Sequence, residues 1–175
     1  MKRSSLADQY CAIARPSAEL TDAWSFVIFR EIMLGNRRFH GLQEQTGMSP
    51  RSLTLRLASL CEHNILERAL YQPSPKRYDY RLTKKGQELW PFIILLKQWG
   101  EKWCGPWEDE EYPMTLMHRD TGHALTVKLV CETCGEPVDA HSATGRISET
   151  MKKERASMAA RHAAKIGRPK KKTEQ

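Results

Sequence analysis

The stretch Phe39–Leu60 constrains the fold more than any other part of the chain. Gly47 separates two segments of helical character, and Ser49 and Pro50 open the second one. Serine is a good N-cap, and a proline at the first helical position loses no hydrogen bond, because the N–H group there has no partner inside the helix. Apolar residues of the second segment recur at helical spacing: Leu53, Leu57, Leu60 and Cys61. We therefore predict two helices joined by a tight turn, the second of them buried along one stripe.

The opposite face of the second helix is polar and basic. It carries Arg51, Ser52, Arg56, Ser59 and His63. Such a face suits the major groove of DNA, where an arginine can donate two hydrogen bonds to guanine or bind a phosphate. An ordinary solvated helix face has the same composition, so this face alone leaves both interpretations open.

Two strand-like segments follow, Ile65–Tyr71 and Arg77–Leu82. The residues between them, Gln72–Lys76, include two prolines, which suit an exposed hairpin tip rather than a central strand. Lys76 and Arg77 would then lie at the tip, where they are placed to meet phosphates. A hairpin directly after a pair of helices predicts a winged helix-turn-helix.

Two further helices complete the predicted fold. Ala18–Leu34 has a wide apolar face and a start signal at Thr21 or Asp22, and Thr83 caps a long helix expected to run to about Trp103. The predicted fold class is mainly α with a small β-wing (α+β). It is a winged helix-turn-helix followed by a small β-rich C-terminal appendage and a basic tail.

The long C-terminal helix carries more apolar and aromatic surface than a small winged helix needs for its own core. The side chains concerned are Leu89, Phe92, Ile93, Leu96, Trp99 and Trp103, of which we assign the first five to dimerisation. A second copy of the chain is the simplest way to cover them. We therefore expect a homodimer.

Charge is distributed unevenly along the 175 residues, whose net charge is +7. Residues 30–85 carry eleven Lys and Arg against five Asp and Glu, residues 86–141 carry four against ten, and residues 142–175 carry ten against three. Basic segments over the predicted winged helix and in the tail indicate an anionic polymer, and we expect double-stranded DNA as the partner.

We divide the chain into five parts by composition and pattern. These are an N-terminal segment (1–17), the winged helix-turn-helix with its dimerisation helix (18–104), an acidic linker (105–113), the β-rich appendage (114–141) and a basic, largely flexible tail (142–175).

The N-terminus lacks the apolar core of a signal peptide, and the longest apolar patch, Leu89–Leu96, is too short to cross a bilayer. We expect a cytoplasmic protein with no membrane partner. In that compartment the five cysteines are expected to be thiols or metal ligands rather than disulfides.

Several spaced segments resemble the HxlR-type family of bacterial winged-helix regulators. The resemblance covers about Cys11 to Trp103 and is carried by Trp24, Phe29–Phe39, Ser49–Leu53, Arg56-Leu57, Leu66–Arg68, Tyr78–Gly86 and Leu89–Pro91. It implies a dimeric transcriptional regulator that pairs through its terminal helices, binds a palindromic operator and responds to a small molecule or a reactive electrophile. Asp22-Ala23 departs from the Gly-Lys of many members, which changes a helix start and not the fold.

We predict that the recognition helix (about 49–63), the wing (about 71–78) and the tail supply the DNA-binding residues. They are Arg38, Ser49, Arg51, Ser52, Thr54, Arg56, Lys76, Arg77, Arg168 and Lys170. Gly167-Arg168-Pro169 followed by lysines resembles the core of an AT-hook, which lays an arginine into the minor groove of A·T tracts. Ile166 stands where the usual basic-Pro element would be, so a generic basic tail explains the segment equally well.

The appendage also looks like an extension found in one branch of the family. Its CxxC spacing suits a knuckle that chelates Zn²⁺, and a four-ligand site needs two more groups. The predicted ligands are Cys131, Cys134, His118 and His123, with His141 a distant candidate. Relatives usually place a cysteine where this chain has Thr121. We expect either one structural zinc per chain or a hairpin held by packing alone, and no other cofactor.

Cys11 precedes the first long helix, where some members of the family carry a thiol that senses oxidants or electrophiles. Nearby Arg15 would lower its pKa, and a buried structural thiol is the alternative. Cys61 lies on the apolar stripe and is expected in the core, whereas Cys104 is open to either interpretation.

Three classes of function compete. No nucleophile with a supporting base and carboxylate stands out, which argues against an enzyme. A sequence-specific regulator is favoured by the winged helix and the resemblance. The alternative is an architectural nucleic-acid-binding protein dominated by the basic tail, which would show strong salt dependence with little sequence preference.

Overall fold

The computed structural model describes residues 4–20, 22–107 and 112–166. Two compact units form: residues 20–142, and residues 1–19 together with 143–175. Arg168 and Lys170, with the AT-hook-like sequence around them, lie outside the described residues.

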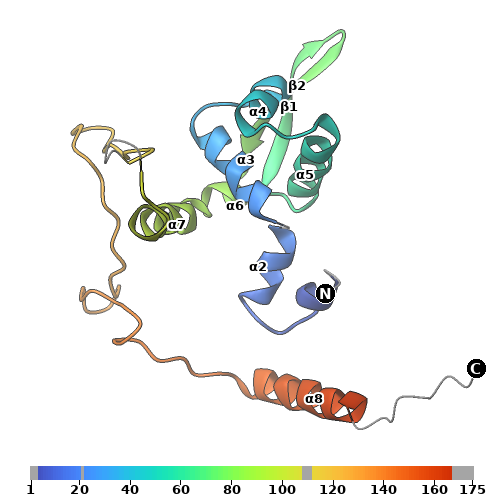
Figure 1. Cartoon of the computed structure of the whole chain (residues 1–175), viewed down its shortest axis with the longest axis vertical. Helices are drawn as coiled ribbons and strands as arrows, with labels where there is room; N and C mark the ends of the chain where they lie inside the picture. Colours follow the sequence, from blue (N-terminus) through green and yellow to red (C-terminus); the bar gives the residue numbers. More distant parts are fainter. Residues whose placement is uncertain (1–3, 21, 108–111, 167–175) are drawn as a thin grey trace, which may run out of the picture. The chain divides into compact units, whose positions relative to one another are not determined.

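The larger unit contains the helix-turn-helix and the wing (Figure 1). Its elements are α3 (Ala23–Met33), α4 (Phe39–Thr46), α5 (Pro50–Glu62), β1 (Leu66–Pro73), β2 (Lys76–Leu82), α6 (Lys84–Gln87) and α7 (Trp90–Trp103). The smaller unit contains α1 (Ser4–Ala7), α2 (Ala14–Glu19) and α8 (Glu149–Ile166).

The helix-turn-helix forms as predicted. Gly47, with a φ of 66°, ends α4 in the left-handed conformation that favours glycine. The Ser49 hydroxyl then accepts the N–H group of Ser52 at 3.2 Å, and Pro50 takes the first position of α5. The predicted buried stripe is confirmed, because Leu53, Leu57 and Leu60 are at most 2% exposed.

The preceding helix begins later than expected. Asp22, one of the two start signals, is the N-cap of α3 and accepts the N–H group of Trp24 at 3.0 Å. The prediction of a helix from Ala18 is therefore wrong at its start. The residues before the cap form the separate short helix α2, which ends at Glu19.

The wing is a two-stranded antiparallel sheet in which Leu66 pairs with Leu82 and Leu70 with Tyr78. A bulge between Leu70 and Gln72 shifts the register, and the ladder continues to Pro73 and Lys76. The strands are therefore longer than predicted, and the tip is only Ser74-Pro75. Pro73 occupies the end of this ladder because a two-stranded ribbon has two open edges, where a missing N–H group costs nothing.

The single helix predicted from Thr83 to Trp103 is two helices. Thr83 caps α6 by accepting the N–H group of Gly86 at 3.1 Å, but the regular α-helix ends at Gln87 and a new one begins at Trp90, with Glu88 and Leu89 forming a turn between them. Pro91 explains the break, since it has no N–H group and its ring collides with the carbonyl four residues earlier.

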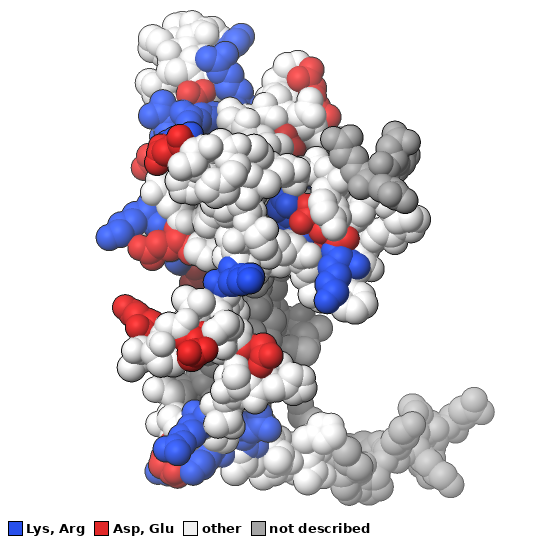
Figure 2. Space-filling view, turned by 90° about the vertical axis from the view of Figure 1, so that its left-hand side faces the viewer, with Lys and Arg blue, Asp and Glu red and all other residues white. Residues whose placement is uncertain are grey.

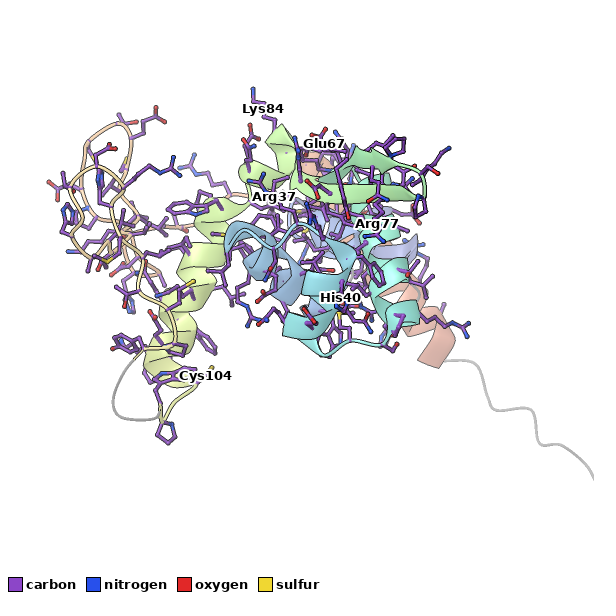
Figure 3. The ribbon with its side chains drawn as sticks, turned by 90° about the horizontal axis from the view of Figure 1, so that it is seen from above. Arg37, His40, Glu67, Arg77, Lys84 and Cys104 are labelled. Carbon is purple, nitrogen blue, oxygen red and sulfur yellow. The ribbon has the colours of Figure 1, made fainter. Side chains whose placement is uncertain are left out.

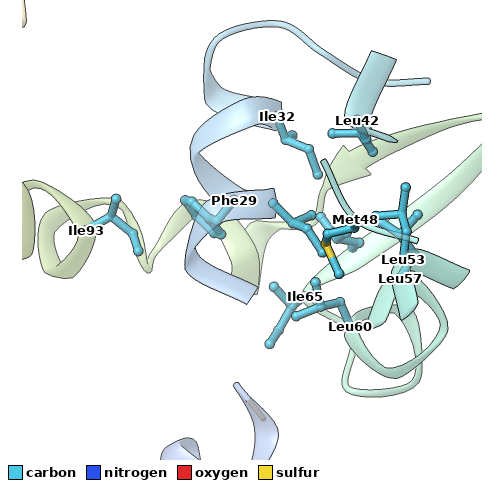
Figure 4. Close-up of a cluster of buried hydrophobic side chains, with 11 residues drawn as sticks. Phe29, Ile32, Leu42, Met48, Leu53, Leu57, Leu60, Ile65 and Ile93 are labelled. Carbon is cyan, nitrogen blue, oxygen red and sulfur yellow. The ribbon is translucent and has the colours of Figure 1, made fainter. Parts of the chain in front are cut away.

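The core lies between α3, α5, the base of the wing and the start of α7 (Figure 4). It is formed by Ile28, Phe29, Ile32, Leu42, Met48, Leu53, Leu57, Leu60, Ile65, Leu66 and Ile93. Cys61 packs at its margin, and burial raises the pKa of this thiol, as expected for a structural cysteine.

The appendage expected at 114–141 consists of two short hairpin turns, each with one antiparallel bridge: Met117 to Ala124 and Val130 to Pro137. In the tail, expected to be largely flexible, the described residues are mainly the 18-residue helix α8. Among the residues described, no helix is long and apolar enough to cross a membrane.

Candidate DNA interface

The outward face of α5 presents one free cation and one apolar side chain near the start of the helix. Arg51 is exposed, and its guanidinium makes no hydrogen bond or ion pair with any described residue. Leu55, one turn further on, is 60% exposed. Arginine can fork onto guanine, and an apolar side chain suits the thymine methyl group. Sequence reasoning missed Leu55, although an apolar residue among polar neighbours was a usable signal.

Two hydroxyl groups predicted to contact DNA already have partners. Ser49 caps α5, and the Thr54 hydroxyl donates to the carbonyl oxygen of Pro50 at 2.8 Å. Both residues remain exposed, and Ser52 is half-buried beside them. Ser49 therefore fixes where the helix starts, whatever else it contacts.

Arg56 is held by the carboxylate of Asp22, the N-cap of α3. One of its terminal nitrogens lies 2.7 Å from Asp22 Oδ2, and its Nε donates to Asp22 Oδ1 at 3.2 Å. Both side chains are only 25% exposed. This bidentate pair ties α5 to the N-cap of α3, an arrangement that helical spacing alone did not indicate.

A basic hollow of about 610 Å³ separates the wing from the start of α4. Its lining combines cations with tyrosine rings: Arg38, Phe39, His40, Tyr71, Lys76, Arg77, Tyr78 and Tyr80. Figure 3 shows Arg37, His40 and Arg77 coming from the loop before α4, from α4 and from the wing. In Figure 2, blue Lys and Arg side chains gather near the wing at the top of the view.

Arg38 is oriented from two sides within this hollow. Its Nε lies 3.5 Å from Asp79 Oδ1, and its guanidinium carbon lies 4.4 Å from the centre of the Tyr71 ring. The side chain stays 66% exposed, so its charge faces solvent and is available to an anion. Lys76 and Arg77 are exposed on the neighbouring strand. His40 was missed because only the fold brings α4 beside the wing, and the wing tyrosines were missed because the sequence does not show that they line a hollow with cations.

The outer face of α7 carries large exposed side chains along one stripe. Phe92, Leu96, Trp99 and Trp103 are 48%, 41%, 58% and 63% exposed. Ile93, predicted with them, is instead 8% exposed and belongs to the core, and Leu89 packs against that core. The uncovered surface is therefore shifted toward the end of the helix, and it includes Trp103.

Cys11 lies in the smaller unit, just before α2. The N–H group of Ala14 donates to its sulfur at 3.4 Å. Hydrogen bonds from the N–H groups of Ala14 and Ile13 lower the pKa of the Cys11 thiol below its ordinary value, while desolvation and the Glu154 carboxylate oppose them. Arg15 instead donates to the carbonyl oxygen of Gln9 at 2.8 Å. Backbone groups therefore favour the thiolate here.

The four predicted zinc ligands do not come together as one site. His118 and His123 stack within the first turn of the appendage, with ring centres 5.3 Å apart, whereas Cys131 and Cys134 belong to the second turn. Nowhere in residues 4–20, 22–107 and 112–166 do three or more His, Cys, Asp or Glu side chains gather in a way that could hold a metal ion. The residues present do not fit the predicted zinc.

A helix-turn-helix joined to a two-stranded wing, with exposed cations on both, defines a winged-helix DNA-binding protein. The chain belongs to the HxlR family, since the HxlR-like helix-turn-helix model matches residues 19–108. It is a helix-turn-helix transcriptional regulator and not an enzyme.

Individual relatives agree with this assignment. An uncharacterized HTH-type transcriptional regulator of Mycobacterium tuberculosis, Rv3095, is 32% identical over 133 residues, which are 76% of this chain and 83% of that protein. The HTH-type transcriptional regulator YodB of Bacillus subtilis is 31% identical over 84 residues, 47% of this chain and 75% of YodB.

Among solved structures, PA1607, a candidate transcription factor, is similar with a TM-score of 0.72 and 30% sequence identity. The match covers 83% of this chain and 99% of PA1607. PA1374 of Pseudomonas aeruginosa, also a candidate transcription factor, matches with a TM-score of 0.57 and 28% identity, over 82% of this chain and 99% of PA1374.

Proposed function

We propose that this regulator binds a palindromic operator as a homodimer, with α5 in the major groove and the wing against the adjacent backbone. The observation that carries the proposal is the free, exposed Arg51 near the N-terminus of α5. In the sequence, α5 comes after the basic loop before α4 and is followed by the basic wing. In this arrangement the N-terminal residues of a recognition helix contact base edges.

Each cation has a distinct role in this proposal. Arg51 contacts a base together with Thr54 and Leu55, while Arg38, Lys76 and Arg77 bind phosphates from the hollow beside the wing. Phosphate contacts position the protein without selecting sequence. Arg56, paired with Asp22, positions α5 against α3.

The test begins by selecting an operator from a pool of random duplexes. Arg51→Ala should weaken binding by about 1–3 kcal/mol and relax preference at one base pair. Lys76→Ala is the matched control: it should weaken all sequences alike and reduce the slope of log K against log salt by about 0.9. If Arg51→Ala binds the selected operator with wild-type affinity and preference, the placement of α5 is wrong.

Dimerisation through α7 is the second part of the proposal. Phe92, Leu96, Trp99 and Trp103 follow one another at spacings of four, three and four residues, which is the pattern of a helix-packing seam. Covering this stripe with the same stripe of a second copy gives a two-fold axis, which suits a palindrome. Leu96→Ala combined with Trp99→Ala should give monomers in light scattering, whereas a wild-type chain that is monomeric at micromolar concentration would exclude the dimer.

We also infer that a reactive electrophile acts at Cys11. The thiolate is the form that reacts, and the N–H groups of Ala14 and Ile13 favour it. Modification of Cys11 should lower operator affinity, and Cys11→Ser should remove that response while leaving binding by the untreated protein unchanged. An identical response in Cys11→Ser would assign the sensor elsewhere.

A further inference from the structure

The appendage contains the same backbone turn twice. In the first copy, the N–H group of Gly122 donates to the carbonyl oxygen of His118 at 2.8 Å. The N–H group of His118 in turn donates to the carbonyl oxygen of His123, also at 2.8 Å. In the second copy, the backbone N–H group of Gly135 donates to the carbonyl oxygen of Cys131, and the backbone N–H group of Cys131 donates to the carbonyl oxygen of Glu136. Both distances are again 2.8 Å. Every position of the first turn thus has a counterpart in the second, 13 residues later (118 to 131).

The glycines complete the likeness. Gly122 and Gly135 have φ values of +68° and +74°, the left-handed conformation that glycine adopts without strain. Because the turns are equivalent, His118 and Thr121 occupy the positions that Cys131 and Cys134 occupy in the second turn. A metal shared between the turns would need a donor at each of these places.

The first turn uses its side chains in another way. Thr121 Oγ1 is hydrogen-bonded to His123 Nδ1 at 2.7 Å, and the rings of His118 and His123 stack with an interplanar angle of 17°. Within this turn, the buried Nδ1 of His118 has no hydrogen-bond partner among the described residues. One nitrogen in a separate turn does not complete a site with two thiols, so the second turn holds its sulfur pair without a third ligand.

The second turn places its two cysteines close together in the backbone. The N–H group of Gly135 donates to the carbonyl oxygen of Cys131 at 2.8 Å, which closes the turn that contains both cysteines. In a four-residue turn the first and last Cα atoms lie within about 7 Å, and most disulfides join Cα atoms about 4.4–6.8 Å apart. Cys134 is exposed and Cys131 is half-buried, so reagents reach Cys134 first.

We propose that Cys131 and Cys134 are a reversible dithiol modification site that hydroperoxides close to a disulfide. The Cys134 sulfur attacks the terminal oxygen of the hydroperoxide, the O–O bond breaks and a sulfenic acid forms at Cys134. The other oxygen takes up the thiol proton and leaves as an alcohol, or as water when the oxidant is hydrogen peroxide. The Cys131 sulfur then attacks the sulfenic sulfur, an S–S bond forms, and the displaced hydroxide leaves as water with the remaining proton. The two thiols lose two electrons in total, and the peroxide oxygen gains them.

The experiment uses the full chain in a Cys11→Ser background, so that the proposed sensor does not contribute. Protein stripped of metal with a chelator is treated with hydrogen peroxide, alkylated, and digested with trypsin. Peptide 129–146, between Lys128 and Arg146, contains both cysteines of the pair and no other. It should appear unalkylated and lighter than the dithiol form by two hydrogen atoms, and dithiothreitol should restore alkylation of both sulfurs.

One variant and one unpaired native cysteine serve as controls. Cys131→Ser should prevent the closed peptide and leave a sulfenic acid at Cys134 that dimedone labels. Cys104, exposed at the end of α7 without a second thiol in its turn, should stay alkylatable at the peroxide dose that closes the pair.

Three results would overturn the proposal. One is a peptide 129–146 that remains doubly alkylated at the dose that begins to oxidise Cys104. Another is a disulfide that joins Cys134 to a second chain. The third is about one equivalent of zinc in protein purified without chelator, with both thiols protected by it, which would return His118 to the role of a ligand.

Discussion

The pair between Arg56 and Asp22 allows the sharpest separation of a structural role from a DNA-contacting one. Arg56→Ala removes one hydrogen bond and one ion-pair contact to a carboxylate in a setting where both partners are 25% exposed. Fully exposed ion pairs contribute up to about 1 kcal/mol, and loss of one partner of a buried pair costs about 3–5 kcal/mol. At this partial burial we expect a loss of about 1–2 kcal/mol in the free energy of unfolding.

For a chain of this length, a loss of that size lowers the melting temperature by about 2–8 °C. Asp22→Asn is the companion variant, because asparagine keeps the N-cap of α3 while the charge is removed. A double-mutant cycle by urea unfolding should give a coupling of about 1 kcal/mol between the two positions. Operator preference should be the same in Arg56→Ala as in the wild type. An unchanged melting temperature combined with relaxed preference at one base pair would show instead that Arg56 contacts DNA and that the pair opens on binding.

Other perturbations test separate parts of the structure. Gly86→Ala should destabilise the chain by about 1–3 kcal/mol in urea unfolding, because its Cβ would lie 2.2 Å from a backbone carbonyl oxygen. Gly100→Ala, whose Cβ would have no atom within 4 Å, should stabilise α7 by about 0.5–1 kcal/mol. Equal effects of the two substitutions would contradict this packing. Ala14→Pro removes an N–H donor to Cys11, so the pKa of that thiol should rise and the pH midpoint of its alkylation should move upward. An unchanged midpoint would exclude this hydrogen bond as the cause of the lowered pKa. Truncation after residue 141 removes the basic tail and should lower DNA affinity most at low salt without changing the ranking of operator variants. A changed ranking would mean that the tail, including the AT-hook-like segment outside the described residues, selects sequence.

Local chemistry made the central elements predictable. Ser49, Pro50 and Gly47 set the boundaries of the helix-turn-helix, because capping and the left-handed conformation depend on a few neighbouring residues. The buried face of α5 followed from helical periodicity, since leucines at helical spacing form a single stripe, and this stripe is buried when it packs against the core. The wing was predicted from two strand-like segments and the prolines between them, although its strands are longer than predicted.

The sequence did not determine which side chains share a site. The break before α7 depends on Pro91. Because α7 begins anew at Trp90, the side chain of Ile93 points into the core, while Trp99 and Trp103 stay exposed. Helical spacing predicted an apolar face but not which part of it the chain covers by itself, because that depends on where the neighbouring α3 lies.

By itself, the sequence determined the helix-turn-helix, the wing, the caps of α5 and α6 and the class of the protein, because these rest on contacts between residues close in the chain. Tertiary structure decided the partners across long separations. It joined Arg56 to Asp22 across 34 positions, placed Arg38 beside Asp79 and Tyr71, and held the two histidines apart from the two cysteines of the appendage. Those outcomes depend on how helices and turns pack, and the energy of packing belongs to the whole arrangement rather than to any one segment.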